Sequence, residues 1–122
     1  MLVVDPNEGP RQAIQIIMRF KFPLADLDSV PVARTAVQRL AEKEYDLLLT
    51  ESWLPGESGL ELVRHVRANY PRVSCAVMTA FDPVLTCKEI RDLRPVFSLM
   101  KPFSVDEFVD GVQRVMRLCG AA

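Results

Sequence analysis

The sequence is poor in several features, and each shortage narrows the class of protein. It has three cysteines, Cys75, Cys87 and Cys119, with no CxxC spacing, so neither a disulfide framework nor a cysteine metal cluster is expected. Lys and Arg number 15 against 16 Asp and Glu, which argues against binding nucleic acid through bulk positive charge. No apolar run approaches a membrane span, and no secretory leader precedes the first apolar segment. We therefore expect a cytoplasmic chain without direct contact to nucleic acid or membrane.

What the sequence does contain is the composition of an ordinary globular domain. Hydrophobic residues make up 49% and charged residues 25%, which excludes a disordered chain. With 122 residues the chain can build one hydrophobic core, so residues 1–122 are expected to form a single domain. Cys75 and Cys119 lie in apolar runs and are predicted to be small core residues.

Short apolar runs alternate with helix-like segments along the chain. The expected strands are Leu2–Val4, a short one near Leu27 and Val30, Tyr45–Thr50, Val73–Ala80 and Val96–Met100. The expected helices are Pro10–Phe20, Ala33–Glu44, a segment from Gly59 onwards, Asp82–Leu93 and a last helix after Ser104, which forms a capping-box pattern with Glu107. Buried strands joined by helices predict an α/β fold of five βα units, with a parallel sheet covered on both faces.

In such a sheet the functional groups lie at the carboxyl ends of the strands. The polar residues expected there are Asp5 and Glu8 after the first strand, Glu51 and Trp53 after the third, Thr79 in the fourth and Lys101 after the fifth. Carboxylates suit a hard cation such as Mg²⁺, while lysine and threonine suit phosphoryl oxygens. The pattern therefore predicts a small oxyanion or metal site at this edge.

These segments, in this order, resemble the receiver domain of bacterial two-component response regulators over essentially all 122 residues. The first reads LVVDPNE where the family has LVVDDNE. The third strand and its helix read YDLLLTESWLPGESGLELVRHVR against YDLVLLDxxMPxxxGLELxRxxR. The fourth strand ends in VMTA, which matches Thr/Ser-Ala, and the fifth reads LMKPFSVDEF against LxKPFxxxEL. The resemblance implies a flavodoxin-like fold and a phosphorelay function, in which a partner's histidine donates a phosphoryl group to an aspartate with the help of Mg²⁺.

The phosphoryl-binding residues carry over only in part. Thr79 and Lys101 match the family residues that bind the phosphoryl oxygens. Glu51 stands at the phospho-acceptor position, four residues before Pro55, where the family has aspartate. The extra methylene moves its carboxylate by up to about 1.5 Å. Two interpretations stay open: Glu51 is an inert relic of a lost site, or its carboxylate reaches Lys101 and Thr79 and partly imitates the phosphorylated state.

The metal ligands carry over less well. Asp5 matches the first residue of the family's acidic pair, but Pro6 occupies the second position and offers no side-chain ligand. Trp53 would supply the backbone carbonyl, and Glu8 is a weak substitute ligand. The resemblance therefore implies a Mg²⁺ site that is weakened. Asp5 can also serve as a carboxylate near a helix N-terminus, or pair with Lys101.

Further residues bear on signalling. Ser98 stands at the switch position, where many members have tyrosine or phenylalanine, and the adjacent Phe97 should point to the other face of the strand. The lone His65 is expected on a solvated helix face, and Trp53 is expected to pack in its loop.

Three functions follow. The leading hypothesis is a degenerate or pseudo-receiver, not an enzyme, that signals by protein contact. Its expected partners are a sensor histidine kinase or another signalling protein, an output domain of its own, or a second copy bound through the fourth helix, fifth strand and fifth helix. The second keeps slow Mg²⁺-dependent phosphorylation of Glu51. The third is a flavodoxin-like small-molecule binder, which the acidic segment after the first strand and the missing glycine-rich loop disfavour.

Overall fold

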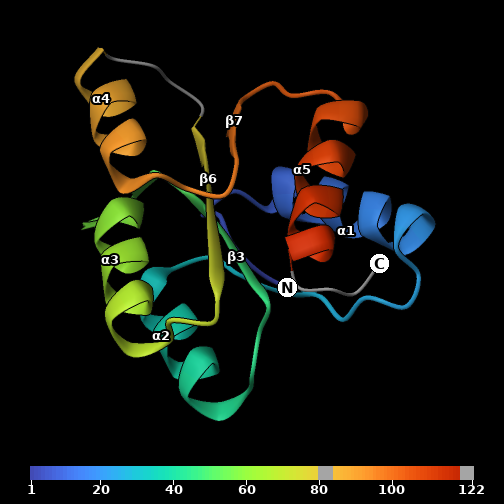
Figure 1. The fold of residues 1–122 in the computed structure, drawn as a ribbon, viewed down its shortest axis with the longest axis horizontal. Helices are drawn as coiled ribbons and strands as arrows, with labels where there is room; N and C mark the ends of the chain where they lie inside the picture. Colours follow the sequence, from blue (N-terminus) through green and yellow to red (C-terminus); the bar gives the residue numbers. More distant parts are fainter. Residues whose placement is uncertain (80–83, 119–122) are drawn as a thin grey trace.

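The computed structural model describes residues 1–79 and 84–118, and it shows a central sheet between two layers of helices (Figure 1). The five sheet strands are β1 (Leu2–Val4), β2 (Asp28–Val30), β3 (Leu47–Glu51), β6 (Ser74–Thr79) and β7 (Ser98–Met100). They are parallel and lie in the order β2-β1-β3-β6-β7. The helices are α1 (Glu8–Lys21), α2 (Ala33–Glu42), α3 (Gly59–Asn69), α4 (Val84–Leu93) and α5 (Val105–Leu118). The predicted five-stranded parallel α/β fold is confirmed.

The two helical layers follow from the alternation of side chains along each strand. In β1, Leu2 and Val4 pack into the core beneath α2, α3 and Ile90 of α4. Val3, between them, faces the core of α1 and α5. All three are fully buried, as expected for an inner strand of a parallel sheet covered on both faces. Figure 1 shows α1 and α5 together on one side of the sheet and α2, α3 and α4 on the other.

The third sheet strand is displaced from its expected position. It covers Leu47–Glu51 and not Tyr45–Thr50, so Glu51 is the last residue of the strand. Tyr45 is buried without belonging to the strand, and its hydroxyl donates to Asp28 Oδ2 at 2.6 Å. Burial and this hydrogen bond raise the pKa of Tyr45 to about 12. The apolar run therefore predicted the burial of Tyr45 correctly, but it placed the start of the strand two residues too early.

A small hairpin follows β3 that the sequence pattern did not predict. It consists of β4 (Trp53–Leu54) and β5 (Glu57–Ser58), which pair antiparallel. Gly56 sits in the turn with a φ of +71°, a conformation that favours glycine. Leu54 is buried, but Trp53 is 68% exposed, so the expectation that Trp53 packs in its loop is wrong.

Helix ends match the sequence signals to different degrees. The capping box before α5 is confirmed: Glu107 N–H donates to Ser104 Oγ at 3.0 Å, and Ser104 N–H donates to Glu107 Oε1 at 3.2 Å. Asn7 is the N-cap of α1, and the helix begins at Glu8 rather than Pro10. Pro10 is tolerated there because the first helical N–H groups have no intrahelical acceptor.

Several sequence predictions concern single residues. Cys75 is buried in the core and His65 is exposed on α3, as expected. Ala80, Asp82 and Cys119, which belong to expected elements, lie outside the described residues. Across the described ranges, the structure contains no helix with the length and apolarity needed to traverse a bilayer.

Gly59 fixes the distance between α3 and the end of β3. A Cβ atom built on Gly59 would lie 1.9 Å from the backbone oxygen of Glu51 and 2.9 Å from its carbonyl carbon. The Gly59 N–H also donates to the Ser52 oxygen at 2.9 Å. Only glycine permits this approach, which sets the N-terminus of α3 against the strand end that carries Glu51.

Substitution of Gly59 by alanine should therefore destabilise the fold although alanine favours helix. We expect a loss of at least about 2 kcal/mol in the free energy of unfolding, because the methyl group meets rigid backbone. Gly9→Ala is the matched control, since a Cβ there meets no atom within 4 Å. Urea unfolding should show Gly9→Ala neutral or stabilised by up to about 1 kcal/mol. Equal behaviour of the two variants would contradict the tight contact at Gly59.

Candidate functional site

Three charged side chains meet at the carboxyl edge of the sheet. Asp5 follows β1, Glu51 ends β3 and Lys101 follows β7. The Lys101 Nζ atom lies 2.8 Å from Glu51 Oε2, and it also donates a hydrogen bond to Asp5 Oδ2. The side chains of Asp5 and Glu51 are 0% and 7% exposed, and that of Lys101 is 13% exposed. One largely buried ammonium thus bridges two buried carboxylates that stand on different strands.

Asp5 is held in place by its own turn. Its backbone N–H donates to the Val30 oxygen at 3.1 Å, which extends the pairing of β1 with β2 by one residue. Its Oδ1 accepts from the Asn7 N–H at 2.9 Å, in the manner of an Asx turn. Arg11 Nη1 donates to the Asp5 backbone oxygen at 2.6 Å. These contacts leave Oδ2 facing Lys101.

Glu51 owes its position to the pairing of β3 with β6. It lies opposite Met78 in this register, and the next residue, Ser52, donates its N–H to the Met78 oxygen at 2.8 Å. Because the pairing with β6 continues to Ser52, the backbone of Glu51 belongs to the sheet and its side chain emerges at the sheet edge. The contact with Gly59 closes the site from the side of α3.

Lys101 is positioned by the last paired strand. Its N–H donates to the Thr79 backbone oxygen at 2.7 Å, and the peptide bond to Pro102 is cis. Thr79 is buried at the end of β6, where it pairs with Met100. The structure therefore brings together four residues that the sequence placed in one site, with Thr79 contacting Lys101 through the backbone.

The electrostatics of the cluster are governed by its single cation. Burial disfavours the charged form of Lys101, but the hydrogen bonds to Asp5 and Glu51 outweigh it and raise the pKa of the Lys101 ammonium above its ordinary value. Lys101 is therefore charged at neutral pH, and two carboxylates share one positive charge. Without it, two buried anions would face each other in a poorly solvated site.

The residues present do not fit a magnesium ion. Mg²⁺ requires several oxygen ligands in near-octahedral geometry. The Oδ2 of Asp5 and the Oε2 of Glu51 both contact Lys101, and Pro6 offers no side-chain oxygen. Among the residues that the structure describes, no group of three or more His, Cys, Asp or Glu side chains is placed to hold a metal. The ammonium of Lys101 stands between the carboxylates that a metal would need.

The side chains of two further sequence-predicted ligands, Glu8 and Trp53, are exposed to solvent. Glu8 is exposed in the first turn of α1, where its Oε1 accepts from Gln12 Nε2 at 2.9 Å. Trp53 belongs to the hairpin after β3 and turns its side chain to solvent. The ligand role of the Trp53 carbonyl stays a prediction.

The predicted switch position lies on the edge strand. Ser98 is exposed in β7 and pairs with Val77. Phe97 is buried in the other layer, where a Cβ on Gly111 of α5 would lie 2.7 Å from its ring. The expectation that Phe97 faces away from Ser98 is confirmed.

Sequence reasoning missed three residues that build the site. Asn7 and Arg11 hold the turn of Asp5, and Gly59 admits the backbone of Glu51. Asn7 two residues after an aspartate is a recognisable Asx-turn signal. The contact of Arg11 depends on the direction of α1 relative to β1, which no local pattern encodes.

Replacement of Lys101 by methionine should lower the stability of the fold, because it leaves two buried carboxylates without their cation. We expect a loss of about 3 kcal/mol in the free energy of unfolding near neutral pH, because the cation is removed from a buried network. Lys88→Met, on the exposed face of α4, is the matched control and should change stability by no more than about 0.5 kcal/mol. Urea unfolding measures both, and similar losses in the two variants would contradict the bridging role of Lys101.

The same comparison has a defined pH dependence. A raised lysine pKa contributes stability that is fully present below the ordinary value of about 10.4 and is lost as pH rises through the higher value of the folded protein. The stability difference between wild type and Lys101→Met should thus stay constant around neutral pH and shrink above about pH 10.4. A difference that already shrinks between pH 7 and about pH 9 would show that Lys101 is not stabilised in its charged form.

Comparison with known proteins agrees with this geometry. Residues 1–113 match the family model of the response regulator receiver domain. The chain is 29% identical to the response regulator protein PilR of Pseudomonas aeruginosa over 96% of its own length and spans 26% of that protein. It is 24% identical to sporulation initiation phosphotransferase F of Bacillus subtilis, covering 97% of this chain and 94% of that one.

Solved structures show the same fold. The signal receiver domain of an HD domain-containing protein from Pseudomonas fluorescens superposes with a TM-score of 0.88 at 24% identity, covering 99% of this chain and 96% of the other. The beryllofluoride-activated NtrC4 receiver domain dimer superposes with a TM-score of 0.86 at 22% identity, covering 95% and 94%. Together with the match over residues 1–113, these findings establish that the chain belongs to the response regulator receiver domain family of two-component signalling.

Proposed function

We propose that this chain is a degenerate receiver that signals by protein contact instead of efficient phosphotransfer. The observation that carries the proposal is the Lys101 ammonium bound to both Asp5 and Glu51. In this arrangement one built-in cation contacts both carboxylates at the position where a metal would otherwise balance them.

Phosphoryl transfer needs an acceptor oxygen aligned with the donor and positive charge on the transferred oxygens. Here Glu51 Oε2 contacts the lysine that should instead hold the phosphoryl group. The longer glutamate side chain shifts the nucleophile, where a displacement of about 1 Å already reduces the rate strongly. The missing second carboxylate at Pro6 removes a metal ligand. The displaced nucleophile affects alignment and the missing carboxylate affects metal binding, so the two defects should slow the reaction more than either one alone.

The geometry favours partial imitation of the phosphorylated state over an inert relic. In the resemblance drawn above, Lys101 binds a phosphoryl oxygen, and in this chain it binds a carboxylate oxygen of Glu51 at 2.8 Å. Glu51 supplies one negative charge where a phosphate carries nearly two. We infer that the chain is held near the signalling state of a phosphorylated receiver. Lys101 is drawn toward β3 although no phosphoryl donor has acted.

The surface formed by α4, β7 and α5 is the proposed site of contact. Met100 and Val105 are 51% and 45% exposed there, so the surface offers two large apolar side chains to a partner. A hollow of about 300 Å³ lies beside Met100 and is also lined by Thr79, Ile90 and Ser98. Because Thr79 is bonded to the backbone of Lys101, this surface is continuous with the charged cluster.

The partners are proposed by their kind of protein. We propose a sensor histidine kinase or another signalling protein, and a second copy of this chain through the same surface. The chain spans about a quarter of the length of PilR, so an output domain joined to it is part of the proposal. A cytoplasmic location follows from the proposed signalling role.

Phosphorylation chemistry tests the proposal directly. Wild type, Glu51→Asp and Pro6→Asp/Glu51→Asp are incubated with acetyl phosphate and Mg²⁺, and their intact masses are measured. We expect no phosphoryl adduct on wild type and one on the doubly repaired variant, because only the latter restores both ligand and acceptor. Glu51→Asp alone separates the acceptor defect from the metal defect. A wild-type adduct located on Glu51 would overturn the proposal in favour of a working, unusual phospho-acceptor.

Trp53 offers a second readout of the same variants. It is the single tryptophan, is 68% exposed and lies two residues beyond Glu51. Its fluorescence should respond to millimolar Mg²⁺ and then to beryllofluoride only in the repaired variant. A wild-type response to both would likewise contradict the proposal.

Self-association tests the proposed surface. Met100→Glu should weaken any dimer by roughly tenfold, because a charge replaces an apolar anchor at the contact. Ile16→Glu, on the remote face of α1 and 57% exposed, is the matched control. Sedimentation equilibrium measures both against wild type. Equal effects of the two substitutions would exclude the α4–β7–α5 surface, and a monomeric wild type would exclude the second copy as partner.

A further inference from the structure

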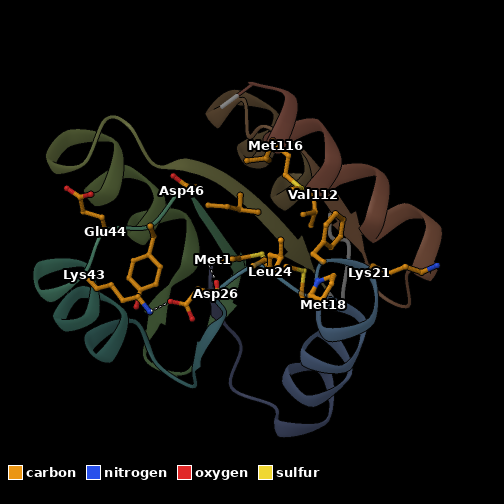
Figure 2. A pocket seen from close by; sticks show the side chains of 16 residues that line it. Met1, Met18, Lys21, Leu24, Asp26, Lys43, Glu44, Asp46, Val112 and Met116 are labelled. Carbon is orange, nitrogen blue, oxygen red and sulfur yellow. Dashed lines mark hydrogen bonds and ion pairs between the residues drawn. The ribbon is translucent and has the colours of Figure 1, made fainter. Parts of the chain in front are cut away.

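A second cavity lies at the opposite edge of the sheet from the charged cluster. It has a volume of about 670 Å³, within the range of small-molecule sites, and opens at the amino ends of β1 and β3 (Figure 2). The end of α1, the segment that follows it, and α5 surround it. None of its lining residues belongs to the cluster of Asp5, Glu51 and Lys101.

The walls of this cavity are apolar and adaptable. They include Met18 of α1, Leu47 of β3 and Val112, Val115 and Met116 of α5. Met18, Leu47, Val112 and Val115 are buried parts of the core between the sheet and these helices, so the wall is preformed. The flexible methionines can adjust to ligands of different shape.

The mouth carries an apolar residue that the fold itself does not bury. Leu24 lines the cavity and is 100% exposed. A fully exposed leucine gains nothing from folding, whereas contact with a bound apolar molecule would remove it from water.

One end of the cavity is polar and negatively charged. Its lining contains the carboxylates of Asp26, Glu44 and Asp46, and the amino groups of Lys43 and Met1. Lys43 Nζ is bound by Asp26 at 2.7 Å and by Asp28 at 3.0 Å, so its charge is shared between two carboxylates. The Met1 amino group donates to the Asp26 backbone oxygen at 2.7 Å.

The two cations at this end, Lys43 and the Met1 ammonium, face four carboxylates, those of Asp26, Asp28, Glu44 and Asp46, and this excess of negative charge favours a cationic ligand group. Glu44 and Asp46 are exposed at this end, and Figure 2 shows both on the opposite side of the pocket from Lys21. A ligand with its apolar body against α1 and α5 would present its polar head to carboxylate oxygens. An ammonium head gains attraction there, while a carboxylate head is repelled.

We propose that this cavity binds a small amphiphile with an apolar body and a cationic head. The site lies between α1 and α5 and bridges the two helices of one layer. A ligand bound there stabilises the folded domain in proportion to its occupancy. This proposal is independent of the phosphorylation chemistry and of the α4–β7–α5 surface.

Matched eight-carbon probes test the proposal. Octylammonium, 1-octanol and octanoate are titrated into the ¹⁵N-labelled protein, and amide shifts are followed by NMR. We expect saturable shifts at Met18, Leu47, Val112 and Met116 with octylammonium, with a dissociation constant of about 1 mM or below. Octanol should bind more weakly and octanoate weakest. The order of the three affinities separates the effect of the head-group charge from the effect of the shared apolar chain.

Variants locate the site. Met116→Trp fills the cavity from its half-buried wall and should weaken octylammonium binding at least about tenfold. Asp46→Asn should weaken octylammonium roughly threefold and leave octanol unchanged, as for an exposed charge pair. Asp92→Asn, on exposed α4, is the matched control and should change neither.

Absence of saturable shifts at the four residues with every probe would show that the cavity binds no such ligand. Equal affinity for octylammonium and octanoate would remove the cationic head from the proposal. Unchanged binding to a Met116→Trp protein with a native, well-dispersed spectrum would place the probe elsewhere.

Discussion

The functional edge of this domain depends on one interaction, the contact of a single lysine with two buried carboxylates from different strands. Lys101 draws the end of β7 toward Asp5 after β1 and Glu51 at the end of β3, across the middle of the sheet. The parallel order of the strands makes the meeting geometrically necessary, and burial makes it energetically decisive, since neither carboxylate tolerates loss of its partner. Lys101 therefore contacts both of the carboxylates on which chemistry at this edge would depend.

The contact of Lys101 with both carboxylates links the two departures from the family pattern, the proline after Asp5 and the glutamate at position 51. Proline after Asp5 removes an acidic ligand and leaves the cluster with two carboxylates for one ammonium. Glutamate at the end of β3 places its Oε2 atom 2.8 Å from Lys101 Nζ. We propose that each change weakens phosphotransfer, and that together they leave Lys101 as the cation that holds the two carboxylates. The proposed signalling by protein contact follows from this internal compensation.

Much of this was readable from the sequence, and the exceptions have physical reasons. Apolar periodicity predicted the parallel sheet, and strand-end polarity predicted that Asp5, Glu51, Thr79 and Lys101 converge, because parallel strands end at one edge. The hairpin after β3 escaped prediction, since strands of two residues carry no periodic signal. Trp53 was misplaced because aromatic side chains are usually buried and its exposure depends on that hairpin. The cavity near Leu24 depends on how α1 and α5 meet, which no local pattern specifies.

The most direct test is to observe the Lys101 ammonium itself. In protein labelled with ¹⁵N and ¹³C, NMR can detect the Lys101 Nζ signal and its couplings through hydrogen bonds to the carboxylate carbons of Asp5 and Glu51. If Lys101 bridges the two carboxylates, its ammonium signal is protected, is coupled to both, and stays unchanged when millimolar Mg²⁺ is added. Loss of the coupling to Glu51 on addition of Mg²⁺, with wild-type stability retained, would show that the metal displaces the lysine and that Lys101 is not a fixed cation of this site.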